Sequence, residues 1–473
     1  MTLLRNSLLA FLANVVGKAV NTIAFILIAR WTGVAQAGIF SLGTTYLVVF
    51  SATSIGLDEL MVRQVARDRA TAGQYFRAFL ILRLLFAFIC YGALYAFIGH
   101  FMGYAPTTSR PILILGLSLI PDCLSNVGSA LLAAHERFEA PLAGGIIASV
   151  VKLGGGIAAI RGNFGLEGVG WAWAAGNLLG MIPVLIATYH LTKPYRPLTG
   201  LNKKFLVDNL RLALPFLVIT FLLTVEYQND VIILSTLRDE IEVGWYGAVT
   251  TLVFALTMLA QGYRAAVYPR MAHYHRTAPD KLRPLYERSF FYLGALALPM
   301  AAGLTLLSRE IVHLIYGPKF APATLPLQII SWFLLFNFLN IPNARLMTVH
   351  ERQNRLVSFF LGSMGVNILL NLILDPTLGA IGAAIARLCS TLTFFLINYL
   401  YVTHHLQPHK LVKALTKPVE AVIIMGVVVW LVRPLNLWLA IASGIISYFF
   451  ALLLLRGLTT EEREWLSRLK KKN

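Results

Sequence analysis

The sequence has little charge. Only 13% of its 473 residues are Asp, Glu, Lys or Arg, whereas a soluble protein averages about 25%. In place of charge, the chain is 57% hydrophobic, and apolar runs of about 20 residues, long enough to cross a bilayer, recur along its whole length. These features exclude a soluble globular chain and predict an all-α protein with many membrane spans.

Cysteine is scarce as well. Cys90, Cys123 and Cys389 lie inside apolar runs without motif spacing, which argues against a disulfide framework or a cysteine-ligated metal. The ten histidines show no metal-ligand spacing, and no Gly-rich phosphate loop is present. The segments between apolar runs are too short for a catalytic domain. We therefore expect no enzyme, no metal and no cofactor, with H⁺ or Na⁺ left as a candidate coupling ion.

The apolar runs divide into about fourteen spans, and their loops alternate in charge. The spans are 8–30, 38–57, 76–99, 110–134, 141–160, 166–190, 211–236, 243–268, 289–308, 323–348, 356–374, 378–402, 418–435 and 437–456. Lys and Arg concentrate in the loops on the side of the N-terminus, so both termini are expected in the cytoplasm. This bias also accounts for the net charge of +18 without nucleic acid. The basic tail, 457–473, is either an amphipathic helix on the membrane or a solvated segment.

One string occurs twice. His135-Glu136-Arg137 is followed 30 residues later by Gly165, and His350-Glu351-Arg352 is followed 29 residues later by Gly379. Gly38-Ile39-Phe40 and Gly244-Trp245-Tyr246 likewise open spans two and eight, and Tyr75 and Tyr286 close the basic loops that follow. The offset is six spans, an even number. Residues 1–192 and 193–417 are therefore expected to form two parallel six-span lobes, with two extra spans in 418–456.

The repeated string invites a catalytic interpretation, but no second base, nucleophile or metal partner lies at useful spacing. We interpret His-Glu-Arg as a charged cytoplasmic turn in each lobe.

The chain resembles the multidrug/oligosaccharidyl-lipid/polysaccharide exporter superfamily, and within it the Wzx-type polysaccharide flippases. The resemblance rests on the fourteen-span pattern, the duplicated lobes, the opening Asn6 to Lys18, and Ala29-Arg30-Trp31-Thr32-Gly33 followed by Gly38-Ile39-Phe40. It implies two helical bundles in a V around a cavity that opens alternately to each side. It also implies a polyprenyl-diphosphate-linked oligosaccharide as cargo.

Ionisable side chains inside spans are costly, so they usually face a cavity or a partner. The basic ones are Lys18, Arg83, Lys152, Arg264, Arg345 and Arg387. Lys18 lies near the middle of its span and shares a helical face with Asn14 and Asn21. We place these eight side chains in the substrate cavity, where a basic lining suits a diphosphate. The competing interpretations are structural ion pairs, tight helix packing near Lys152, and snorkelling at span ends.

Two acids form the candidate ion-coupling site. Glu226 and Asp230 are four residues apart and share one face of the seventh span. They hold either a proton or sodium ion, or a basic partner.

The expected function is a flippase of the cell inner membrane that works by alternating access and is driven by an ion gradient. A peptidoglycan lipid II flippase, or a cation-coupled multidrug exporter of the same superfamily, remains an alternative. A membrane-embedded glycosyltransferase fits poorly because no large loop is present. Expected partners are the lipid-linked oligosaccharide and membrane lipids, with a polysaccharide polymerase or glycosyltransferases as further candidates and no nucleic acid.

Overall fold

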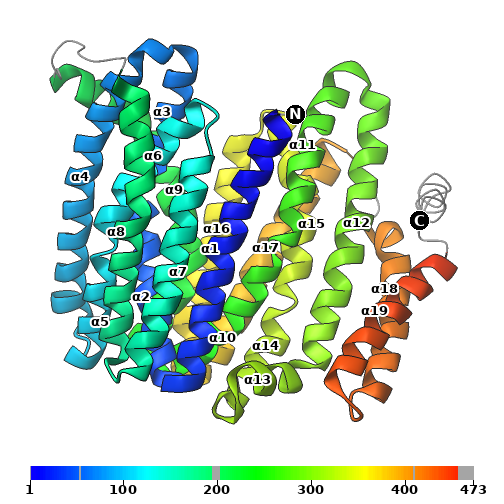
Figure 1. Cartoon of the computed structure of the whole chain (residues 1–473). Coiled ribbons are helices and arrows are strands. Elements are labelled where there is room, and N and C mark those ends of the chain that lie inside the picture. Colours follow the sequence, from blue (N-terminus) through cyan, green and yellow to red (C-terminus); the bar gives the residue numbers. More distant parts are fainter. Residues whose placement is uncertain (1, 53–54, 194–202, 408–410, 456–473) are drawn as a thin grey trace. The chain divides into compact units, whose positions relative to one another are not determined.

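The computed structural model describes the backbone of residues 2–52, 55–193, 203–407 and 411–455, and the side chains of 17–52, 57–193, 203–407 and 411–455. All regular elements of these residues are helices (Figure 1). They are α1 (Thr2–Thr32), α2 (Val34–Ala52), α3 (Ile55–Arg67), η1 (Arg69–Thr71), α4 (Ala72–Ala96), η2 (Phe97–Met102), α5 (Pro106–Gly116), α6 (Leu119–Ala134), α7 (Glu139–Arg161), α8 (Gly165–Thr192), α9 (Lys203–Leu237), α10 (Glu240–Leu256), α11 (Leu259–Thr277), α12 (Pro279–Leu306), α13 (Ser308–Tyr316), η4 (Pro318–Ala323), α14 (Thr324–Ile330), α15 (Phe333–Val349), α16 (Gln353–Leu378), α17 (Ala380–His405), α18 (Leu411–Val432) and α19 (Leu437–Leu454). The predicted all-α class is confirmed.

The described residues contain 12 helical stretches that are long and apolar enough to cross a membrane. A thirteenth is the pair α10 and α11, which bends by 40° at a short break. The remaining predicted span, 8–30, falls in α1, a helix of 31 residues. A multi-pass membrane protein is therefore confirmed. The interpretation of the tail concerns residues that lie outside the described part of the chain.

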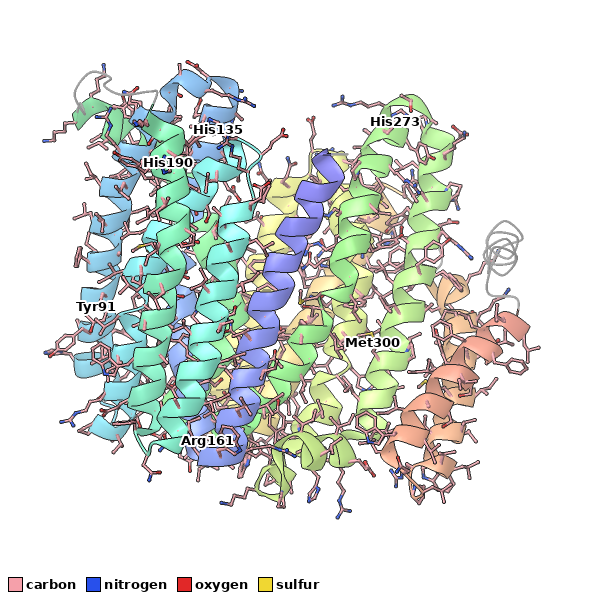
Figure 2. The ribbon with its side chains drawn as sticks, in the orientation of Figure 1. Tyr91, His135, Arg161, His190, His273 and Met300 are labelled. Atoms are coloured by element: carbon pink, nitrogen blue, oxygen red, sulfur yellow. The ribbon has the colours of Figure 1, made fainter. Side chains whose placement is uncertain are left out.

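The chain divides into two compact units, residues 1–248 and 249–473. In the first unit α7 packs along α8 and α1, while α6 packs on α3, α4 and α8. Figure 2 shows His135 and His190 at one end of this unit and Arg161 at the other. In the second unit α12 packs on α15 and α18, and α16 pairs with α17. The predicted lobe boundaries at 192 and 417 stay predictions.

The repeated His-Glu-Arg strings fold alike. Glu136 and Glu351 both have φ of 58°, a left-handed conformation that ends a helix. The next residue then donates its amide back over the turn, from Arg137 to the Leu132 carbonyl at 2.9 Å and from Arg352 to the Met347 carbonyl at 2.8 Å. Each string therefore ends one helix and starts the next.

The paired glycines at the starts of spans two and eight meet each other. A methyl group on Gly38 would overlap the carbonyl oxygen of Glu240 and approach the amide nitrogen of Gly244 to 2.9 Å. A methyl group on Gly244 would overlap the carbonyl oxygen of Val34. Because Val34 and Glu240 each precede their glycine by four residues, α2 and α10 cross through equivalent positions.

Candidate functional site

Two of the predicted substrate residues come together in the second unit. Arg264 of α11 lies close enough to Arg345 of α15 to repel its guanidinium electrostatically. The Arg345 guanidinium also lies over the ring of Tyr268, with 5.4 Å between its central carbon and the ring centroid. Arg264 and Tyr268 are exposed, and Arg345 is half-buried. Two like charges held together in this way favour an anion between them.

Tyrosine hydroxyls fix this pair through α12. Tyr263, which precedes Arg264, donates to the Ser289 hydroxyl at 2.7 Å. Tyr286 donates to the side-chain oxygen of Asn343, two residues before Arg345, at 2.6 Å. Since Ser289 and Tyr286 lie one turn apart on α12, that helix sets the spacing of both arginines. Tyr286 is the tyrosine that the sequence repeat singled out.

A histidine pair continues the basic face toward the repeated turn. The rings of His275 on α11 and His350 after α15 lie 4.4 Å apart between centroids. The Nδ1 atom of His350 is 2.9 Å from the Leu346 carbonyl, so this nitrogen carries the proton of the neutral ring. Burial lowers the pKa of His350, and the neighbouring His275 and Arg352 lower it further. We call the set Arg264, Tyr268, His275, Arg345 and His350 the basic face of α11 and α15.

Arg83 is paired within the first unit. It is 1% exposed and forms an ion pair with Asp58 of α3. The partner carboxylate is itself influenced by Asp122 of α6. The structure therefore favours the structural-pair interpretation of Arg83, because its charge is already compensated within the first unit.

Lys152 belongs to the same group of charges. It attracts Asp122 electrostatically, and Asn126 donates to that carboxylate at 3.2 Å. The Lys152 ammonium also lies 5.8 Å from the centroid of the Trp173 ring. It borders a small cavity of about 10 Å³ between α1, α7 and α8, which is about the space of one water molecule. Lys152 thus has a carboxylate and an aromatic neighbour inside the first unit.

Lys18 and Asn21 are both exposed on α1, consistent with the polar stripe expected of that helix. The side chain of Asn14 lies outside the described residues. The part these three residues play in substrate binding stays a prediction.

The two candidate coupling acids are buried. Glu226 is 7% exposed and Asp230 is 2% exposed, both on α9. The Tyr246 hydroxyl donates to Asp230 at 2.5 Å. The tyrosine of the Gly244-Trp245-Tyr246 string therefore holds one of the two acids.

Arg387 is fully buried on α17. The helix α16, which packs on α17, carries a polar stripe that the sequence reasoning missed: Ser363, Asn367, Asn371 and Asp375, at intervals of four, all at most 2% exposed. Asn367 donates to Ser390 of α17 at 3.4 Å, and Asn371 donates to the Asn367 carbonyl at 2.8 Å. The spacing of four was present in the sequence and was the signal that could have revealed the stripe.

Within the described ranges, no group of three or more His, Cys, Asp and Glu side chains is arranged to hold a metal ion.

Comparisons with known proteins agree with this architecture. A family model described as polysaccharide biosynthesis protein matches residues 46–325. Two proteins of Haloferax volcanii are similar over most of their length. The probable low-salt glycan biosynthesis flippase Agl15 is 22% identical, with 86% of this chain and 84% of that protein covered. The probable flippase AglR is 24% identical, with 95% of each covered.

Solved structures share the fold. The lipid II flippase MurJ in an inward closed conformation has a TM-score of 0.76 at 16% identity, covering 96% of this chain and 99% of that one. A multidrug resistance MATE family transporter of the MOP superfamily, inward-facing, has a TM-score of 0.67 at 15% identity, covering 82% and 95%. These likenesses confirm the all-α fold with many membrane spans that the sequence predicted.

Proposed function

Because the chain belongs to the family of polysaccharide biosynthesis proteins, we propose that it is a flippase for polyprenyl-diphosphate-linked oligosaccharide. The proposed membrane is the cytoplasmic membrane, with both termini in the cytoplasm, as the loop charges favour. The two Haloferax volcanii relatives are named as flippases, one of them for glycan biosynthesis. Transport, and no covalent chemistry, is the activity.

The observation that carries the proposal is the convergence of Arg264 and Arg345. A diphosphate offers several anionic oxygens, and two guanidinium forks can bind them at once. Bound substrate would relieve the repulsion between the two arginines, so binding is favoured at this point of the second unit. An exporter of organic cations would need the opposite charge here.

The basic face suggests an order of events. The diphosphate first meets the turn at His350, where Arg352 adds positive charge and the His275 ring lies against the His350 ring. It then moves about one and a half turns along α15 to Arg345, and about three turns along α11 to Arg264. Alternating access between the lobes would expose the sugar on the far side of the membrane.

Ion coupling is a further part of the proposal. The buried acids Glu226 and Asp230 are candidates to hold H⁺ or Na⁺ when Tyr246 is displaced from Asp230. Replacement of both acids by their amides should then abolish the dependence of transport on the ion gradient.

The test is flipping in proteoliposomes loaded with a fluorescent polyprenyl-diphosphate oligosaccharide, with outer-leaflet exposure as the readout. Arg264→Ala and Arg345→Ala should each slow flipping about tenfold or more, as expected for a lost charge-assisted hydrogen bond. Arg283→Ala is the matched control, because Arg283 is exposed in the same unit and pairs only locally with Glu287 at 3.0 Å. Normal flipping by the Arg264 and Arg345 variants would refute the site. Preferential movement of lipid II, or of organic cations, would assign the protein to a different activity.

A further inference from the structure

A groove of about 480 Å³ lies between α4 and α8 in the first unit, a size typical of ligand sites. Its apolar wall includes Phe76, Leu80, Leu185 and Ile186, and its rim includes Arg77 and His190. No candidate residue of the transport site contributes to it. Ile186 and Tyr189 are 54% and 49% exposed, so the wall presents apolar surface that a membrane would cover.

The rim of this α4–α8 groove is basic. Arg77 and His190 are both exposed on it. The Nε atom of Arg77 donates to the Gly73 carbonyl at 3.2 Å, which lays the arginine stem along its own helix. Lys193, also exposed, follows Ile186 and Tyr189 by seven and four residues and so lies on the same helical face. Arg77, His190 and Lys193 therefore place three basic side chains at one end of the apolar α4–α8 groove.

The two ends of the α4–α8 groove differ in polarity. His190 lies at the end of the unit that also carries His135, opposite Arg161 (Figure 2). Leu80 is three residues further into α4 than Arg77, and Leu185 is five residues further into α8 than His190. The basic groups are thus at headgroup level while the apolar residues lie deeper, which matches the polarity of one lipid molecule.

We propose that the α4–α8 groove binds an anionic phospholipid of the cytoplasmic leaflet. The lipid phosphate pairs with Arg77 and His190, and one acyl chain packs on Phe76, Leu80 and Ile186. Assignment to the cytoplasmic leaflet rests on the orientation given with the proposed function, and that leaflet carries the anionic lipids which attract basic segments. One arginine with an imidazole suits a phosphodiester of single charge, whereas the diphosphate of the transported lipid is matched by the Arg264 and Arg345 pair.

The experiment measures lipid binding to the purified full-length protein by native mass spectrometry. Dioleoylphosphatidylglycerol, which is anionic, and dioleoylphosphatidylcholine, which is zwitterionic, are the probes, since they share the same acyl chains and differ only in the headgroup. The protein should retain phosphatidylglycerol about tenfold more strongly than phosphatidylcholine, and Arg77→Ala with His190→Ala should remove that preference. Ile186→Trp, which fills the apolar wall, should weaken binding of both lipids.

Arg69→Ala is the matched control, because Arg69 is an exposed arginine of the same unit that does not line the groove. It should leave the preference for phosphatidylglycerol intact. Equal binding of the two lipids by the natural protein, or an unchanged preference in the double variant, would overturn the proposal. The protein could instead bind polyprenyl diphosphate more strongly than phosphatidylglycerol and lose that binding in the same double variant. That result would show that the groove binds the transported lipid and would overturn the proposal. Since no flipping is measured, these outcomes are independent of whether the protein transports lipid-linked oligosaccharide.

Discussion

Gly38 of α2 and Gly244 of α10 lie at a reciprocal backbone crossing, in which each glycine faces the carbonyl four residues before the other. Alanine at either position would make a methyl group overlap a backbone carbonyl oxygen. Because that oxygen is part of a helix, the whole helix would have to shift to relieve the clash. We expect Gly38→Ala and Gly244→Ala each to cost about 3 kcal/mol, at the upper end of overpacking. The measurement is the apparent Tm of the purified protein.

The double variant at this crossing should cost less than the two single variants together, because one displacement of α2 from α10 relieves both clashes. Gly145→Ala and Gly154→Ala are the controls, since an added Cβ would meet no atom within 4 Å at either position. They should be neutral or stabilising, by at most about 1 kcal/mol. Equal losses at all four glycines would show that no close crossing exists.

At the repeated turn we expect a substitution to raise stability, opposite to the loss expected at the glycine crossing. Glu136 and Glu351 have a left-handed φ of 58°, a conformation that costs an L-residue about 1–2 kcal/mol. Glycine relieves that cost but loses more entropy on folding, so Glu136→Gly and Glu351→Gly should raise stability by about 0.5 kcal/mol. Valine, which tolerates positive φ poorly, should lower it by about 1 kcal/mol or more. Glu139→Gly, in the first turn of α7, should destabilise.

The two turns offer a comparison between themselves. If the duplication is structural, each substitution should have the same sign at Glu136 and at Glu351. Chemical denaturation of the two glycine variants and the two valine variants settles this. A large loss of transport without loss of stability would instead give the two glutamates a role in transport.

The buried Arg83 pairs with the partly buried Asp58, so removing one partner leaves an uncompensated charge. Arg83→Met should destabilise the first unit by about 3 kcal/mol. Asp58→Leu together with Arg83→Met should recover much of that loss, because both charges leave the apolar interior. The exposed pair of Arg283 and Glu287 is the comparison, where the same cycle should give at most about 1 kcal/mol. Additive losses at Asp58 and Arg83 would contradict the pairing.

Much of the fold could be predicted because its signals are local. The length of the apolar runs predicts the membrane spans. The repeated strings identify Glu136 and Glu351, which lie 215 residues apart and share a left-handed backbone conformation. The resemblance to the exporter superfamily is confirmed by the matching family and folds. The bend between α10 and α11 differs from the single span predicted over 243–268, because apolar length alone does not mark a break within a span.

The side-chain partners could not be predicted, because they depend on which helices pack together. Arg83 and Lys152 looked alike in the sequence, as single charges in apolar spans. The pair with Asp58 arises from the packing of α3 on α4, and the proximity of Asp122 to Lys152 arises from the packing of α6 on α7. The polar stripe on α16 was missed for another reason. Three of its four members are neutral, and neutral polar side chains stand out less than charges in an apolar span.

The pH dependence of stability should report on His350. Burial, His275 and Arg352 lower the pKa of this ring in the folded protein, while in the unfolded chain it titrates near 6.5. Between the lowered value and about 6.5 the unfolded chain therefore binds more protons, so stability falls as the pH drops below about 6.5. Thermal unfolding at about pH 5.5 and 7.5 should show this loss, and His350→Asn, which keeps a side-chain donor without a titrating ring, should reduce it. His404→Asn, at an exposed histidine of α17, should leave the pH dependence unchanged. If both variants keep the natural profile, the acid sensitivity comes from other groups and His350 does not resist protonation in the fold.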